Sequence, residues 1–274
     1  MSPKTATNSD HADHADDANH AIVARPEWLR ARKALLEREK ELSRLRDDLA
    51  QRRRDLPWVR IDKNYLFVGP KGVESLSDLF RGRSQLIVYH FMFGPEWSEG
   101  CPGCSFVSDH VDGAIPHLEH RDVTWVAVSR APIAKIEAFK KRMGWRFPWF
   151  SSSGSSFNFD FGVSASDEAK RANKLEYNYE VKEGAMDEMP GASVFIKAED
   201  GTICHTYSAY ARGLELQIGT YQWLDLLPKG RDEEGLAFPM AWLRHHDRYG
   251  PDYAVDPNAT FHPPLEKPAP AASS

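Results

Sequence analysis

Two continuous apolar runs mark the expected centre of the fold. The first covers Leu86–Phe93 and the second lies within Asp122–Ser129. Their length and their β-branched and aromatic residues are typical of strands buried on both faces of a sheet. A helix that ends early, at Gly113 or Pro116, is expected between them, and another helix over Pro132–Met143. The order strand, helix, strand, helix predicts a parallel core.

Shorter patterned segments lie on either side of these runs. They are two short strands at Leu56–Ile61 and Tyr65–Val68, a helical turn at Ser75–Phe80, two further strands at Gly191–Lys197 and Thr202–Tyr207, and a last helix over Tyr210–Leu227. We interpret the first two strands as a hairpin. The Asp200-Gly201 turn predicts a hairpin for the later two.

A charged helix is expected before this domain. Within residues 23–55, apolar side chains recur every seven positions among many charges of both signs, which predicts an amphipathic helix. The stripe consists of Trp28, Leu35, Leu42 and Leu49, with Leu45 beside it. Two functions fit the stripe: packing against the chain's own domain, or dimerisation as a short coiled coil.

Composition divides the chain into four parts. Residues 1–22 are small and polar and residues 251–274 are rich in proline and alanine, so both are expected to be disordered tails. Between them lie the helix of residues 23–55 and one domain over residues 56–250. A chain of 274 residues with 41% hydrophobic residues is long enough to bury such a core.

An unusually aromatic stretch, Trp145–Phe150, precedes the Ser/Gly run of residues 151–156. A run of this kind inside a domain forms either a flexible linker or an ordered loop. The aromatic residues on both sides favour an ordered loop that lines a cleft.

The strongest chemical signal is Cys101-Pro102-Gly103-Cys104, which follows the first apolar run after a turn-rich loop. The free N–H groups and the dipole of a helix N-terminus favour a thiolate there, and Pro102 suits the first helical position. The spacing predicts a redox dithiol in which an exposed Cys101 attacks and Cys104 resolves the mixed disulfide. Trp97 and Phe106 are expected to form an apolar collar around the pair, and Trp97 and Pro102 are expected to contact the substrate.

A metal site is the main alternative for this motif. Structural zinc sites normally add a second Cys or His pair to a CxxC. The only other cysteine is Cys204, but His90, His110, His117 and His120 offer nitrogen ligands. A non-enzymatic module that holds a metal therefore stays open, although we predict neither a bound metal nor a cofactor.

Charge and hydropathy limit the kinds of binding partner that we expect. A net charge of -5 gives no case for nucleic-acid binding, and no segment has the length of a transmembrane helix. Three cysteines without a signal-peptide pattern predict a cytoplasmic protein. The expected partners are a protein or small-molecule disulfide, a cellular thiol reductant and, through the charged helix, a second copy of the chain.

The chain also resembles a bacterial domain-of-unknown-function family described as predicted dithiol-disulfide oxidoreductases. The residues that carry the resemblance are Leu56–Val59, Tyr89–Pro95, Cys101–Cys104, Phe157–Val163 and His205–Ser208. The resemblance implies an α/β, thioredoxin-like fold: a central mixed sheet flanked by helices, with the charged amphipathic helix at its N-terminal end. It also implies thiol-disulfide exchange.

Three site assignments follow from the thioredoxin-like resemblance. His90 occupies about the place of a buried acid beneath the dithiol, where it would move a proton to or from Cys104. Glu96 or Glu99 in the longer loop before the CxxC could take the same role, and a hydrogen-bonded core histidine is an equal alternative for His90. Pro190 is the candidate for a cis-proline that faces the CxxC and contacts substrate. A peroxiredoxin-like peroxidase stays open, with Ser98 where those proteins have threonine.

Overall fold

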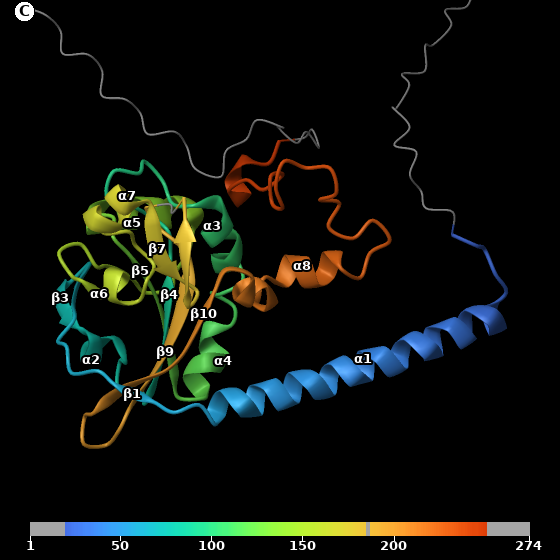
Figure 1. Ribbon diagram of the computed structural model, residues 1–274, viewed down its shortest axis with the longest axis horizontal. Coiled ribbons are helices and arrows are strands. Elements are labelled where there is room, and N and C mark those ends of the chain that lie inside the picture. Colours follow the sequence, from blue (N-terminus) through green and yellow to red (C-terminus); the bar gives the residue numbers. More distant parts are fainter. Residues whose placement is uncertain (1–19, 185–186, 251–274) are drawn as a thin grey trace, which may run out of the picture. The chain divides into compact units, whose positions relative to one another are not determined.

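The computed structural model describes residues 20–184 and 187–250 (Figure 1). The chain forms two units, Met1–Asp55 and Leu56–Ser274. The predicted disordered tails lie outside the described residues, except for residues 20–22.

The helices are α1 (Arg25–Arg54), α2 (Leu76–Leu79), α3 (Pro102–Ser108), α4 (Ile115–His120), α5 (Ile133–Met143), α6 (Phe157–Asp160), α7 (Asp167–Ala172), α8 (Gly219–Leu224) and the 3-10 segments η1 (Ala211–Gln217) and η2 (His246–Arg248). The strands are β1 (Val59–Arg60), β2 (Leu66–Gly69), β3 (Gly72–Ser75), β4 (Gln85–His90), β5 (Val123–Ser129), β6 (Trp149–Ser151), β7 (Lys174–Tyr177), β8 (Glu180–Glu183), β9 (Gly191–Lys197) and β10 (Ile203–Tyr210).

The first unit contains α1, the predicted charged helix, which is confirmed. Glu27 lies in its first turn and Arg52, Arg53 and Arg54 in its last, so the charges at both ends complement the helix dipole. Ion pairs one turn apart, such as Arg52 with Asp48, add to its stability.

The second unit is built on one mixed sheet with the strand order β1-β10-β9-β4-β5-β6-β2-β3. β4, β5 and β6 are parallel, whereas β9 is antiparallel to β4 and β10 is antiparallel to β9. The central order β10-β9-β4-β5-β6, with these directions, is that of a thioredoxin-like fold. The predicted fold class is confirmed.

Helices cover both faces of this sheet, as Figure 1 shows for α3 and α4 on one side and for α2 and α6 on the other. The two faces bury separate apolar clusters. Ile87 and Tyr89 pack in the cluster that includes residues of α3, whereas Leu86 and Val88 belong to the one that includes residues of α2 and α6. Alternate residues of β4 therefore serve opposite cores, which explains its continuous apolar sequence.

Several predicted elements are confirmed with small shifts, among them β5, α2, α5 and the β9–β10 hairpin. The helix after residue 101 ends at Ser108, and Pro116 lies in the first turn of the separate α4. Gly144 closes α5 in a left-handed conformation (φ 69°) that costs glycine little.

Three element predictions were wrong. The strand expected over Leu86–Phe93 ends at His90. The two strands within residues 56–68 do not pair with each other: β1 pairs with β10, and β2 pairs with β3 and β6. The last helix is replaced by the end of β10, η1 and α8, because residues 210–227 include Gly213 and Gly219, which disfavour a long helix.

Candidate functional site: a buried dithiol

The CPGC sequence joins the loop after β4 to α3. Cys101 is the N-cap residue of α3, and Pro102 occupies the first helical position, where its missing N–H leaves no donor unpaired. The Cys101 N–H donates to the Met92 carbonyl (3.0 Å), and the Met92 N–H donates to the Cys104 Sγ (3.3 Å). The backbone of Met92 therefore pairs with the dithiol instead of a neighbouring strand, which is why the strand ends early.

Both cysteine side chains are buried, each with 2% of its surface exposed. The prediction of an exposed Cys101 was therefore wrong. Segments distant in sequence cover the start of α3: Pro190, η1 and Met240 share with the two cysteines the walls of a cavity of about 250 Å³.

Hydrogen bonds decide how the pair ionises. Burial acts to raise the pKa of Cys104, but hydrogen bonds from the Cys101 thiol, the Tyr89 hydroxyl and the Met92 N–H outweigh it and lower that pKa. Burial raises the pKa of Cys101 well above its ordinary value, and the neighbouring Cys104 adds to the rise. Cys104 is therefore the thiol of the pair that ionises first, with the Cys101 thiol donating to it.

Tyr89 is the strand residue that meets the dithiol. Its ring is buried in the same cluster as both cysteines, and burial followed by the charge of Cys104 raises its pKa well above the ordinary value. The hydroxyl therefore stays protonated and donates to Cys104. Tyr89 was not predicted from the sequence. Only the alternation of side chains along β4, counted from a residue known to face α3, identifies Tyr89.

His90 points to the opposite face of the sheet, and its prediction as a proton carrier beneath Cys104 was wrong. Its ring lies against Phe157 and Phe161 (centroids 5.4 and 5.7 Å away), and its Nε2 shares a hydrogen bond with the Ser193 Oγ (2.8 Å). Burial, followed by the charge of nearby His205, lowers the pKa of His90 to about 3. The alternative of a hydrogen-bonded, neutral core histidine is the one observed.

Of the predicted site residues Pro190, Trp97 and Phe106, one lines the cavity with the cysteines and two do not. Pro190 lines the cavity with both cysteines, but the described residues contain no cis peptide bond, so the expectation of a cis-proline was wrong. Trp97 packs against the same cluster without lining the cavity. Phe106 packs against Tyr221 and Trp242 instead (ring centroids 5.4 and 5.7 Å away). The expected collar of Trp97 and Phe106 is therefore absent from the cavity wall.

Comparison with known proteins identifies the family. A family model described as "Bacterial protein of unknown function (DUF899)" matches residues 17–249. The chain belongs to this family. No curated protein matches the sequence significantly.

Solved structures similar to this DUF899 member include redox proteins. Peroxidoxin BcpB from Mycobacterium tuberculosis is 13% identical, over 60% of this chain and 95% of that one, with a TM-score of 0.41. A PrxQ mutant from Xylella fastidiosa is 14% identical, over 61% and 94%, with a TM-score of 0.39. A Chlorobium tepidum protein assigned as thiol:disulfide interchange protein DsbE is 15% identical, over 60% and 97%, with a TM-score of 0.38. Proteins this different can share a fold without sharing an activity.

An ion-pair cluster fixes the loop in front of Cys101 in this DUF899 chain. Glu99 accepts hydrogen bonds from Arg142 (2.8 Å) and from both terminal nitrogens of Arg248 (2.8 and 2.7 Å). Arg142 also pairs with Asp247, and the His245 ring nitrogen Nε2 lies 2.8 Å from the Gly100 carbonyl. The segment around η2 therefore anchors the two residues that precede the dithiol.

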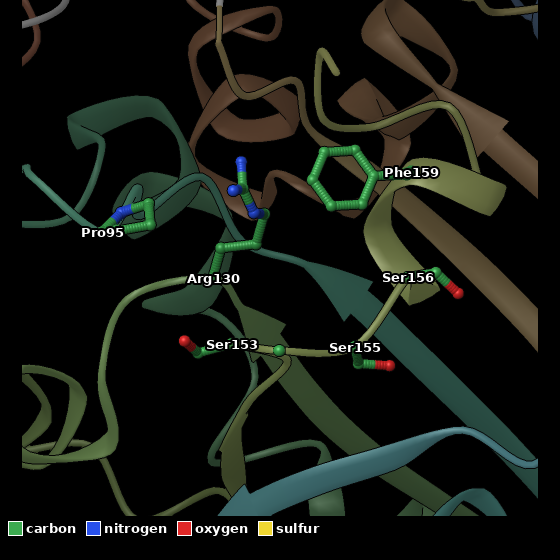
Figure 2. A pocket seen from close by; sticks show the side chains of 7 residues that line it. Pro95, Arg130, Ser153, Ser155, Ser156 and Phe159 are labelled. Carbon is green, nitrogen blue, oxygen red and sulfur yellow. The ribbon is translucent and has the colours of Figure 1, made fainter. Parts of the chain in front are cut away.

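A second cavity, of about 410 Å³, lies near the ends of β5 and β6. Figure 2 shows the Arg130 side chain extending between Pro95 and Phe159, with Ser153, Ser155 and Ser156 on the adjoining loop. This confirms an ordered Ser/Gly loop beside a cleft. The Arg130 guanidinium forms an ion pair with Glu188 (2.9 Å) and lies over the Phe159 ring (4.5 Å). The charge of Arg130 is therefore already paired within the protein. The cavity with the sulfurs is therefore the candidate site.

The structure does not support the alternative of a metal site. Within residues 20–184 and 187–250, no three His, Cys, Asp or Glu side chains are grouped so that they could hold a metal ion. Cys204 lies apart on β10, half-buried and unbonded to another cysteine. None of the helices in the described part of the chain is long and apolar enough to cross a membrane.

Proposed function

We propose that this protein is a thiol-disulfide oxidoreductase in which Cys101 and Cys104 alternate between a dithiol and a disulfide. The observation that carries the proposal is a hydrogen-bonded pair of sulfurs at a helix N-terminus, with donors that stabilise one thiolate and a cavity that reaches both. A buried cysteine without these features is inert.

The first chemical step uses the pair as nucleophile and base. The Cys101 sulfur attacks one sulfur of the substrate disulfide while its proton passes to the Cys104 thiolate along the hydrogen bond between them. The substrate S–S bond breaks, one half leaves as a thiolate, and the other half stays bonded to Cys101. The backbone N–H groups of Gly103 and Cys104, which act to lower the pKa of Cys101, favour charge on this sulfur during attack.

The second step closes the internal disulfide. Cys104 loses its proton to the departing thiolate, attacks the Cys101 sulfur and expels the second half of the substrate. The lowered pKa of Cys104 favours release of this proton. Two electrons and one proton pass from the pair to the substrate, the second substrate thiolate takes its proton from solvent, and a cellular thiol reductant restores the dithiol. In this scheme Pro190 contacts the substrate from the cavity wall.

A peroxidase is not proposed. Ser98, which stands where peroxiredoxins have threonine, is exposed in the loop and does not line the cavity with the sulfurs.

Trapping of the mixed disulfide tests the proposal. Cys104→Ser lacks the base that takes the Cys101 proton, so it is incubated with diethyl disulfide at alkaline pH, where it is expected to gain one ethylthio group at Cys101 because the second step is blocked. Cys101→Ser is expected to react at least ten times more slowly, and Cys204→Ser like the unmodified protein. Intact mass and peptide mapping give the result. Absence of an adduct on Cys104→Ser, with the unmodified protein failing to form a Cys101–Cys104 disulfide, overturns the proposal.

A further inference from the structure

The walls of the dithiol cavity are almost entirely apolar. Besides the two cysteines, the apolar side chains that form it are Met92, Val107, Pro190, Leu214, Ile218 and Met240. Among the residues that the structure describes, Arg212 and Glu215 are the only charged ones in its lining, and they form hydrogen bonds with each other (2.9 and 3.2 Å). The cavity therefore offers a bound molecule contact with apolar atoms and no separate charge.

The size of the cavity limits what enters. Its volume of about 250 Å³ lies below the roughly 300–1,000 Å³ of common ligand pockets. Both cysteines have 2% of their surface exposed, so a disulfide on the surface of a folded protein does not reach them past η1 and Met240. A molecule of a few non-hydrogen atoms on each side of its S–S bond fits.

Electrostatics act in the same direction. Moving a charged group from water into an apolar cavity is costly unless a partner charge is present. The Arg212 and Glu215 charges engage each other, and the dithiol itself carries negative charge when reactive, which repels an anion at short range. Apolar groups, by contrast, gain about 25 cal/mol for each Å² removed from water.

We propose that the dithiol acts on small, uncharged disulfides with apolar substituents, in preference to small anionic disulfides and to disulfides of folded proteins. This specificity rests on the thiol-disulfide exchange proposed above. The reaction is R–S–S–R plus the dithiol giving the Cys101–Cys104 disulfide and two R–SH, with regeneration by a thiol reductant.

Three disulfide probes that differ in charge test the preference: diethyl disulfide, the dication cystamine and the dianion 3,3′-dithiodipropionate. Oxidation of the reduced protein is followed by quenched alkylation and mass, and each rate is divided by the rate of the same probe with free dithiothreitol at the same pH. The normalised rate for diethyl disulfide is expected to exceed that for 3,3′-dithiodipropionate at least tenfold, whereas the cations of cystamine meet the negative charge of the reactive dithiol and show whether the sign of the charge matters.

A charged cavity wall is the matched variant. Met240, half-buried in the wall, is changed in Met240→Lys, with Leu226→Lys as a control because Leu226 is exposed and does not line the cavity. Met240→Lys is expected to lower the diethyl disulfide rate and to raise the 3,3′-dithiodipropionate rate, each at least threefold, whereas Leu226→Lys changes neither.

The outcomes separate the two proposals. Equal normalised rates for all three probes with the unmodified protein overturn the specificity and leave the exchange reaction standing. Failure of every probe to produce a Cys101–Cys104 disulfide overturns the exchange and the specificity together. If Met240→Lys does not fold, as judged by circular dichroism, the comparison of the three probes on the unmodified protein still decides.

Discussion

The Tyr89 hydroxyl donates a hydrogen bond to Cys104 from the second-last residue of β4, just before the loop that leads to the dithiol. The next residue, His90, faces the other core and takes no part in this contact. The proton chemistry of the site therefore depends on a tyrosine that lies one residue away from the histidine predicted for it.

Removal of the Tyr89 hydroxyl is expected to make the dithiol less acidic. Tyr89→Phe keeps the buried ring but removes a donor to the thiolate, and a hydrogen bond to a charged group contributes about 1.5–3 kcal/mol. The first thiol pKa of the pair should rise by roughly one to two units. The pH dependence of iodoacetamide alkylation measures this. An unchanged profile for Tyr89→Phe contradicts the assigned contact.

His90 is expected to govern acid stability and not thiol chemistry. Its folded pKa of about 3 lies below its unfolded value near 6.5, so the unfolded chain binds the extra proton and stability falls as pH decreases from 6.5 toward 3. The slope from this group approaches about 1.4 kcal/mol per pH unit. In urea titrations, His90→Gln should flatten this slope.

The thiol alkylation profile of His90→Gln is the control for that experiment. Because His90 faces the opposite core, the profile should match that of the unmodified protein. A shift comparable to that of Tyr89→Phe argues that His90 acts on the dithiol after all.

Glu188 is expected to give the opposite pH dependence. Burial, only partly offset by Ser164 and Arg130, raises its pKa to about 7. The folded chain therefore holds a proton that the unfolded chain has lost, and the stability from this group is complete below about pH 4.5 and is lost as pH rises through 7. Glu188→Gln should remove this decline in urea titrations between pH 4.5 and 8. A decline of the same size in the variant assigns it to other groups.

The Glu99 cluster is expected to stabilise the loop that leads into Cys101. Glu99→Gln removes the negative charge shared by Arg142 and Arg248, and exposed or partly exposed pairs of this kind contribute about 1 kcal/mol or less each. We expect a loss on the order of 1 kcal/mol in chemical denaturation, shrinking at high salt. Glu96→Gln, an exposed change in the same loop, should have no measurable effect. Equal losses for the two variants argue against the cluster.

Local patterns sufficed for part of this site. Pro102 at a helix start and the apolar runs of β4 and β5 are short-range signals, and they placed the dithiol at the end of the correct strand. The sequence of β4 does not show whether Tyr89 or His90 faces α3. A strand that is buried on both faces is apolar throughout, so it has no polar side that would indicate which residues face which core.

Long-range packing supplied what the sequence did not. Cys101 is predicted to be exposed from its position at a helix N-terminus, yet residues such as Leu214 and Met240, more than a hundred positions later, bury it. The segment that contains Leu214 looks helical by composition and instead forms η1 over the cavity. No local pattern reports a contact at that separation.

The most direct test of the redox dithiol is the pH-dependent alkylation of Cys101 and Cys104 in the reduced protein, read residue by residue by mass. The account predicts a first ionisation below the ~8.5 of a free thiol, loss of that step in both Cys101→Ser and Cys104→Ser, and a reversible Cys101–Cys104 disulfide. Two independent thiols with ordinary or raised pKa values, and no such disulfide under mild oxidation, would contradict it.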